Sequence, residues 1–161
     1  MNANLNRTDI QKLVLAGVDS STESRDILIA ARAEARNLGA NLRVVMTTSV
    51  PISMMAVPLP LSAIEQAANT KLKELLSEVF GPDFAEKVDS EVVSGSAARI
   101  LIDESANADL LVIGSRGHGP VVGAIIGSVS QQCVAHAHCP VLVVRGERRE
   151  YISLADPVFV G

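Results

Sequence analysis

Short apolar runs alternate along this chain with longer segments that have the pattern of helices. The runs expected to form strands cover residues 12–18, 42–47, 87–93, 110–113 and 141–144. The segments expected to form helices lie between them, ending near 38, 80, 107 and 135. Strands that alternate with helices are typical of a parallel α/β sheet. We therefore expect a single open five-stranded parallel sheet with helices on both faces.

Turn-forming residues mark the ends of these segments. Residues 20–23, Ser-Ser-Thr-Glu, predict a capping box for the first helix, and Gly39 predicts its end. Ser62 with Glu65 predicts the start of the second helix, which Gly81-Pro82 would end. Residues 50–60 are apolar but contain three prolines, which indicates a surface loop rather than a central strand.

The strand expected over 110–113 runs into the glycine-rich segment GSRGHGPVVGAIIGS, residues 114–128. Its spacing is G-x-x-G-x9-G-S, formed by Gly114, Gly117, Gly127 and Ser128, and a helix is expected to follow. Glycines let the backbone approach a ligand, and the N–H groups at a helix start favour negative charge. The segment fits neither a Walker loop nor the dinucleotide fingerprint. It predicts a site for a phosphate-bearing ligand, although a plain strand-to-helix turn is the alternative.

Composition and charge narrow the function classes. The chain has 161 residues, 48% apolar and 2% aromatic, with a net charge of −4, which argues against nucleic acid as a partner. It shows neither an apolar run long enough for a membrane span nor a signal-peptide core, so we expect a cytoplasmic protein without a membrane partner. Cys133 and Cys139 have no zinc-site spacing, and His136 and His138 make a poor ligand pair, so no protein metal site is expected.

Three segments spread along the chain are similar to the universal stress proteins. LVLAGVDSS at 13–21 resembles the family's opening strand and acidic turn, and DLLVIGSRG at 109–117 resembles its fourth strand. CPVLVVR at 139–145 resembles its closing strand. The glycine spacing matches the family's nucleotide-binding branch. The resemblance implies a Rossmann-like sheet of order 3-2-1-4-5, formed by a domain over 1–148 and followed by a tail over 149–161.

The resemblance also implies a binding site for ATP, or for AMP or ADP, with Mg²⁺ accompanying the phosphates. Asp19 would contact the nucleoside sugar, or it would only start the following helix. Thr47 and Ile113 would flank the adenine, or they would be ordinary β-core residues. The residues that match phosphate-end contacts are Gly114, Arg116, Gly117, Gly127, Ser128 and Val129. His118 could add charge there, although a solvated loop tip is the preferred interpretation.

No catalytic residues are predicted, because no nucleophile motif such as G-x-S-x-G is present. We expect an ATP-binding stress-response regulator with little or slow hydrolysis, forming a homodimer through the last strand, 141–144. One alternative is a dimeric interaction module that binds no nucleotide. A weaker one is an adenylating enzyme, whose S-G-G-x-D-S motif this chain lacks after its first strand. The apolar tail would be either frayed or an arm that packs on a partner subunit.

Overall fold

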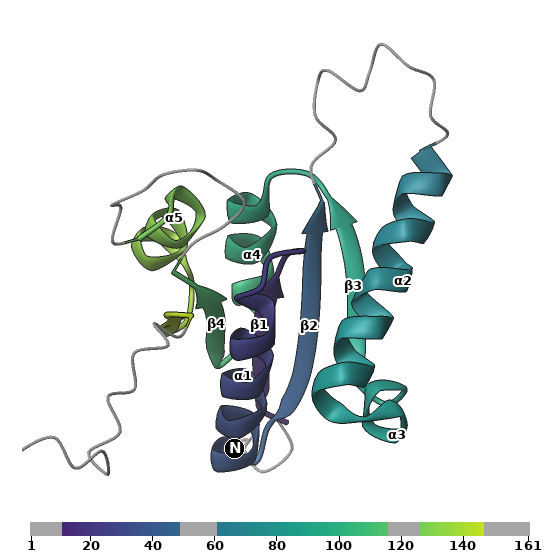
Figure 1. Cartoon of the computed structure of the whole chain (residues 1–161). Coiled ribbons are helices and arrows are strands. Elements are labelled where there is room, and N and C mark those ends of the chain that lie inside the picture. Colours follow the sequence, from purple (N-terminus) through teal and green to yellow (C-terminus); the bar gives the residue numbers. More distant parts are fainter. Residues whose placement is uncertain (1–10, 49–60, 116–125, 147–161) are drawn as a thin grey trace, which may run out of the picture.

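Five parallel strands form one open sheet of order β3-β2-β1-β4-β5 (Figure 1). The computed structural model describes residues 11–48, 61–115 and 126–146. The strands are β1 Leu13–Val18, β2 Asn41–Thr48, β3 Asp89–Ser94, β4 Leu110–Gly114 and β5 Val141–Val144. The helices are α1 Ser24–Leu38, α2 Leu61–Phe80, α3 Pro82–Ala85, α4 Ala97–Ser105 and α5 Ser128–His136. The predicted fold and strand order are confirmed.

The helix ends differ in part from the prediction. Gly39 does end α1, with the left-handed backbone expected of a C-cap (φ 62°). The predicted capping box is wrong: α1 begins at Ser24, and its N-cap, Glu23, makes no side-chain cap hydrogen bond. The second helix begins at Leu61, so Ser62 lies inside its first turn. The sequence Gly81-Pro82 predicts only a helix stop, but in the structure Pro82 begins the short helix α3, because proline also suits a first helical position.

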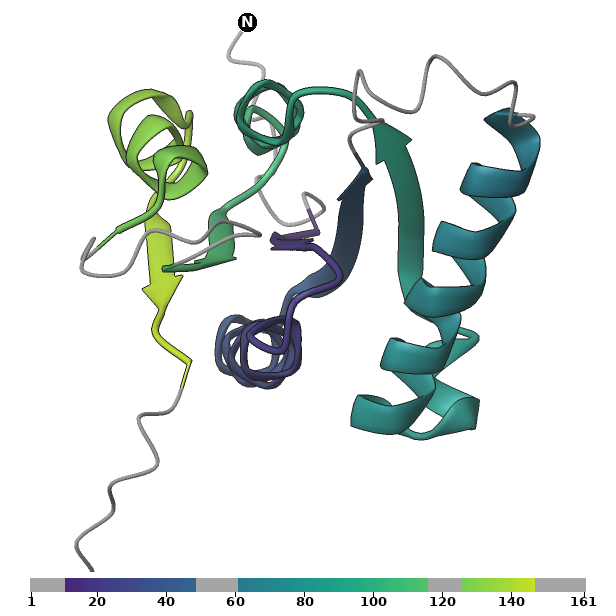
Figure 2. The ribbon, with the colours of Figure 1, turned by 45° about the horizontal axis from the view of Figure 1, so that its top comes forward.

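Helices cover the two faces of the sheet in pairs, α1 with α2 on one face and α4 with α5 on the other (Figure 2). Side chains alternate between the faces along each strand, so the strands supply two separate cores. The core under α1 and α2 contains Val14, Val44 and Val112, each fully buried. The core under α4 and α5 is centred on Leu15, Val45, Leu111 and Cys133. Apolar residues buried on both faces account for the near-continuous apolar runs of the central strands.

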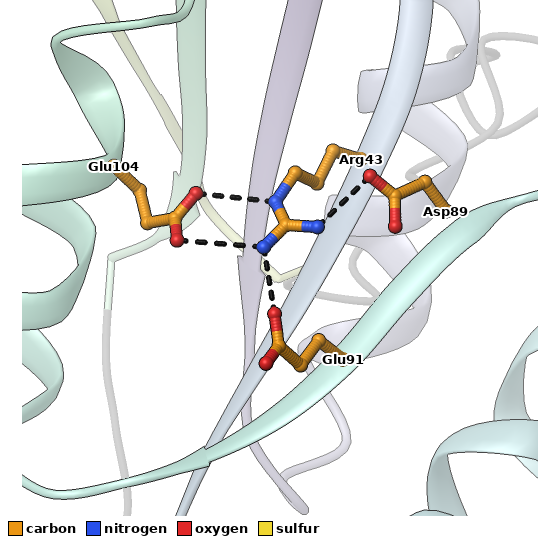
Figure 3. A network of polar contacts seen from close by, with 4 residues as sticks. All are labelled: Arg43, Asp89, Glu91 and Glu104. Atoms are coloured by element: carbon orange, nitrogen blue, oxygen red, sulfur yellow. Dashed lines mark hydrogen bonds and ion pairs between the residues drawn. The ribbon is translucent and has the colours of Figure 1, made fainter.

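Arg43 ties β2, β3 and α4 together (Figure 3). Its guanidinium donates to Asp89 at 2.8 Å and to Glu91 at 2.7 Å on β3, and to Glu104 at 3.1 Å on α4. The hydrogen bond to Glu104, with those to Asp89 and Glu91, raises the pKa of Arg43 above its usual value, against the opposing effect of burial. The network fixes α4 over β2 near the strands' amino-terminal ends.

The two edge strands differ in chemistry. β3 begins with exposed Asp89, Ser90 and Glu91, and charged side chains of this kind protect a sheet edge from further pairing. In contrast, β5 is entirely apolar, and its Leu142 is 37% exposed. Over the described residues, no helix combines the length and the apolar character needed to cross a membrane.

Candidate functional site at the carboxyl ends of β1 and β4

Of the residues singled out in the sequence, those that the structure describes lie at the carboxyl ends of β1, β2 and β4 and at the start of α5. Ala16 pairs with Val112, so Asp19 and Ser115, each three residues further on, lie at one level. Val18 pairs with Met46, which places Thr47 level with Asp19 on the other side. The strand order reverses between β1 and β4, and open α/β sheets bind ligands at such a switch point.

Thr47 and Ile113 occupy the same face of the sheet as α4 and α5, following the alternation set by Val45 and Leu111. Ile113 is 2% exposed and packs in the core under these helices. In this structure it is therefore an ordinary β-core residue. Thr47 is half-buried near the end of β2. Of the two, Thr47 is therefore the more accessible to a ligand at this edge.

Asp19 follows β1 and closes the turn toward α1. Its Oδ1 accepts a hydrogen bond from the N–H of Ser21 at 2.8 Å. The hydroxyl of Ser24 donates to the Asp19 carbonyl at 2.7 Å, accepts from the Asp19 N–H at 3.1 Å and lies 3.2 Å from Oδ1. The Asp19 carboxylate thus organises the turn, while the N-cap of α1 is Glu23. A carboxylate has two oxygens and accepts several hydrogen bonds, so this role is compatible with binding hydroxyl groups.

The glycine segment returns to the point from which it leaves the sheet. The N–H of Gly127 donates to the carbonyl of Ser115 at 2.6 Å, and the N–H of Ser115 donates to Val144 on β5 at 2.7 Å. One backbone hydrogen bond therefore closes the loop over 116–126. The expected donor at Gly127 is engaged by the protein itself, which leaves the N–H groups of Ser128 and Val129, in the first turn of α5, as candidates to face an anion.

Ser128 and Val129 have the positions expected of a helix start. Gly127 is the N-cap with an extended backbone (φ −71°, ψ 164°), and Ser128 is the first helical residue and exposed. Val129 is half-buried and packs on the core under α4 and α5. Arg116, Gly117 and His118 lie outside the described residues.

Sequence reasoning missed two residues that shape this edge. Ser130 is 4% exposed, and its hydroxyl donates to the carbonyl of Gly114 at 2.5 Å, joining α5 to the end of β4. A Cβ at Gly17 would lie 2.7 Å from Leu101 and 3.2 Å from Ile113, so this glycine lets α4 approach β1 closely. A glycine inside a strand is a known signal of such an approach and could have identified Gly17. No comparable signal identifies Ser130.

The cysteines and acidic residues do not form a metal centre in the described part of the chain, where no three His, Cys, Asp or Glu residues cluster suitably. Cys133 is fully buried, and burial raises the pKa of its thiol from 9.0 to about 11. Burial also raises the pKa of Cys139. Both thiols are therefore protonated at neutral pH, which makes them poor nucleophiles.

Comparison with known proteins agrees with this architecture. The model of the Universal stress protein family matches residues 12–145. A universal stress protein of Mycobacterium tuberculosis is 36% identical over 135 residues, covering 82% of this chain and 45% of the relative. A universal stress protein of Thermus aquaticus, encoded in the 3′ region of a QAH/OAS sulfhydrylase, is 30% identical over 136 residues, covering 83% of this chain and 98% of the relative. The chain spans about half the length of the mycobacterial relatives it matches.

Solved structures show the same fold. Universal stress protein UspA from Lactobacillus plantarum superposes with a TM-score of 0.67 at 23% identity, covering 83% of this chain and 97% of that one. A universal stress protein in complex with cAMP superposes with a TM-score of 0.60 at 21% identity, covering 83% and 96%. Because the family model spans most of its length and relatives at 30% identity or more align along it, this chain belongs to the universal stress protein family.

Proposed function

We propose that this chain binds an adenine nucleotide at the carboxyl ends of β1 and β4 and acts as a stress-response regulator with slow or no hydrolysis. The observation that supports it is the convergence of Asp19, the end of β4 and the start of α5 at one edge. Asp19 would accept hydrogen bonds from the ribose hydroxyls. Ser128 and Val129 would donate backbone hydrogen bonds to the phosphates, and Thr47 would lie beside the base.

The family comparison supports the nucleotide. One structural neighbour is a universal stress protein in complex with cAMP, an adenine nucleotide, so the shared fold accommodates such a ligand. The glycine spacing from Gly114 to Ser128 is a second, independent argument. Gly114, Gly117 and Arg116 would complete the proposed phosphate end, together with Gly127 as the N-cap, and Ile113 would flank the adenine with Thr47.

Magnesium would arrive with the nucleotide. Because no set of three potential ligands clusters in the described residues, the phosphate oxygens would supply most of the coordination. The chain's part is to hold the nucleotide, through Asp19 at the sugar and through the α5 start at the phosphates. We therefore expect adenosine to bind in the absence of magnesium, and ATP to bind together with magnesium.

The first experiment is calorimetric titration of Mg-ATP into nucleotide-stripped protein, with competition by ADP, AMP, cAMP and adenosine. We expect one site per chain. Asp19→Ala should weaken ATP and adenosine alike, because the sugar is common to both. Asp83→Ala is the matched control, since Asp83 lies on α3, away from the carboxyl ends of the strands (Figure 1). If wild-type protein binds none of these nucleotides, the interaction module without nucleotide becomes the better proposal.

Gly127 tests the phosphate end separately. Its backbone (φ −71°, ψ 164°) suits any residue, so Gly127→Val should fold with an unfolding midpoint close to wild type. The valine side chain would occupy space beside the phosphates, and we expect Mg-ATP binding to be lost while adenosine still binds. A large fall in the unfolding midpoint would instead show that Gly127 is needed by the fold.

We also propose that the chain forms a homodimer through β5. The apolar residues Val141–Val144 form an unprotected sheet edge, and exposed Leu142 would be buried by a second copy. Leu142→Lys should convert the dimer to a monomer in sedimentation velocity, because a lysine on an edge strand opposes pairing. Ser90→Lys on the other edge strand, β3, where the residue is exposed, serves as the control and should leave the mass unchanged. Deleting 149–161 should change the mass only if the tail is an arm on the partner.

A further inference from the structure

Ser24 is buried where α1 begins, and its side chain turns back toward the strand it follows. The residue is fully buried (0% exposed). Its hydroxyl is within hydrogen-bond distance of three atoms of Asp19, namely the carbonyl oxygen at 2.7 Å, the backbone nitrogen at 3.1 Å and Oδ1 at 3.2 Å.

The hydroxyl is held by a rigid element. α1 buries Ile27, Leu28 and Ala31 against the sheet one and two turns beyond Ser24, so the position of the helix start is set by the core. Asp19, in contrast, lies beyond the last residue of β1, Val18, and has no place in the strand. The hydroxyl of Ser24 therefore links the start of α1 to the residue that directly follows β1.

We propose that Ser24 is a positioning residue for the ligand site: its buried hydroxyl, bonded to the Asp19 backbone and 3.2 Å from Oδ1, fixes Asp19 so that the carboxylate meets the ribose hydroxyls. This inference rests on the proposed nucleotide-binding function. Ser24 itself does not touch the nucleotide. Its effect passes through Asp19, so it should influence every ligand that carries the sugar and should vanish when the carboxylate is absent.

A double-mutant cycle on adenosine binding tests this directly. Adenosine lacks phosphates, so its affinity reports the sugar and base end of the site alone. We expect Ser24→Ala to weaken adenosine binding about tenfold, equivalent to about 1.4 kcal/mol. In an Asp19→Ala background, the same substitution should change affinity less than about twofold, because coupled residues do not act additively. Ser24→Cys, which places a larger and weaker donor at the same position, should give an intermediate loss and serves if the alanine variant does not fold.

Ser105 provides a matched control. It is also fully buried, its hydroxyl donates to the Ile102 carbonyl at 2.6 Å, and it accepts from the His138 N–H at 2.9 Å. It ends α4 at the amino-terminal side of the sheet, away from Asp19. Ser105→Ala should lower the unfolding midpoint as Ser24→Ala does, yet leave adenosine affinity within about twofold, since it is uncoupled from the site.

Three outcomes would overturn the inference. If wild-type protein binds adenosine and Ser24→Ala binds it equally well, Ser24 serves only the fold, and the proposed function stands. If Ser24→Ala weakens binding equally with and without the Asp19 carboxylate, its effect does not pass through Asp19. If wild-type protein binds neither adenosine nor Mg-ATP, the proposed function fails and the inference fails with it.

Discussion

The hydroxyl of Ser130 donates a hydrogen bond to the carbonyl oxygen of Gly114 over 2.5 Å, joining the third residue of α5 to the last residue of β4. A second bond, from the N–H of Gly127 to the carbonyl of Ser115, closes the intervening loop. The start of α5 is therefore fixed relative to the end of β4 by two adjacent bonds. Any ligand held by the first turn of α5 meets a donor group of defined position.

Ser130→Ala should destabilise the fold, because it removes a buried hydroxyl and leaves the Gly114 carbonyl without that donor. We expect a loss of about 1–2 kcal/mol in the free energy of unfolding, measured by urea denaturation. Ser77→Ala, which removes an exposed serine from α2, is the control and should change stability by less than about 0.5 kcal/mol. Equal effects of the two substitutions would show that the Ser130 bond contributes nothing.

Gly17→Ala should also destabilise the fold, by overpacking. The new Cβ would lie 2.7 Å from a terminal methyl group of Leu101 and 3.2 Å from Ile113, so the buried Leu101 side chain would have to shift. We expect a cost of about 1–3 kcal/mol, measured by thermal or urea unfolding. The cost should shrink in a Leu101→Ala background, where the space is available. If Gly17→Ala costs as much free energy in the Leu101→Ala background as in wild type, the strain does not come from contact with Leu101.

Ser21→Ala should be neutral or stabilising, in contrast to Ser24→Ala. The Ser21 Oγ is buried and has no hydrogen-bond partner within the described part of the chain, whereas the N–H that bonds Asp19 remains after the substitution. Removing a buried, unpartnered hydroxyl relieves a desolvation cost of about 1–3 kcal/mol at most. The measurement is the unfolding midpoint by differential scanning calorimetry. A clear fall in the midpoint would show that the hydroxyl has a partner in solution, such as an ordered water.

The free energy of unfolding should fall above pH 9, partly because of Cys133. Burial raises the pKa of its thiol from 9.0 to about 11 in the folded chain. Between these values the unfolded thiol loses its proton while the folded one keeps it, so rising pH favours unfolding. Below pH 9 both states are protonated, and the thiol adds no pH dependence. Urea denaturation at pH 7 and pH 10 should show a smaller loss for Cys133→Ala than for wild type.

The fold was predictable because its signals are local and repeated. Valine, leucine and isoleucine fill the central strands on both faces, and glycines such as Gly39 mark where helices stop. The start of α1 was not predictable in the same way. Residues 20–23 have the composition of a capping box, yet the turn is organised by Asp19 and Ser24, five residues apart and on either side of it. The hydrogen bonds between Ser24 and Asp19 prevailed over the capping-box preference.

Some residues of the candidate site could likewise be predicted from the sequence, and others could not. Asp19, Gly114, Gly127 and Ser128 follow from sequence spacing and from the strand order, which brings β1 beside β4. The supporting hydroxyls of Ser24 and Ser130 do not, because a buried serine and an exposed one look identical in a sequence. Likewise, nothing in the glycine spacing shows that the N–H of Gly127 is engaged by Ser115. Such contacts depend on how separate elements pack.

The two edge strands of the sheet differ in charge, and this difference affects how copies of the chain could assemble. Asp89 and Glu91 line one border, and the apolar residues of β5 form the other. If two chains pair through their β5 strands, as proposed, the outer edges of the joined sheet are the two β3 strands. In such a pair, the charges on the β3 edges would oppose the addition of a third copy to the sheet. If the proposed dimer forms, the difference between the two edges would therefore disfavour growth into ribbons and fibrils.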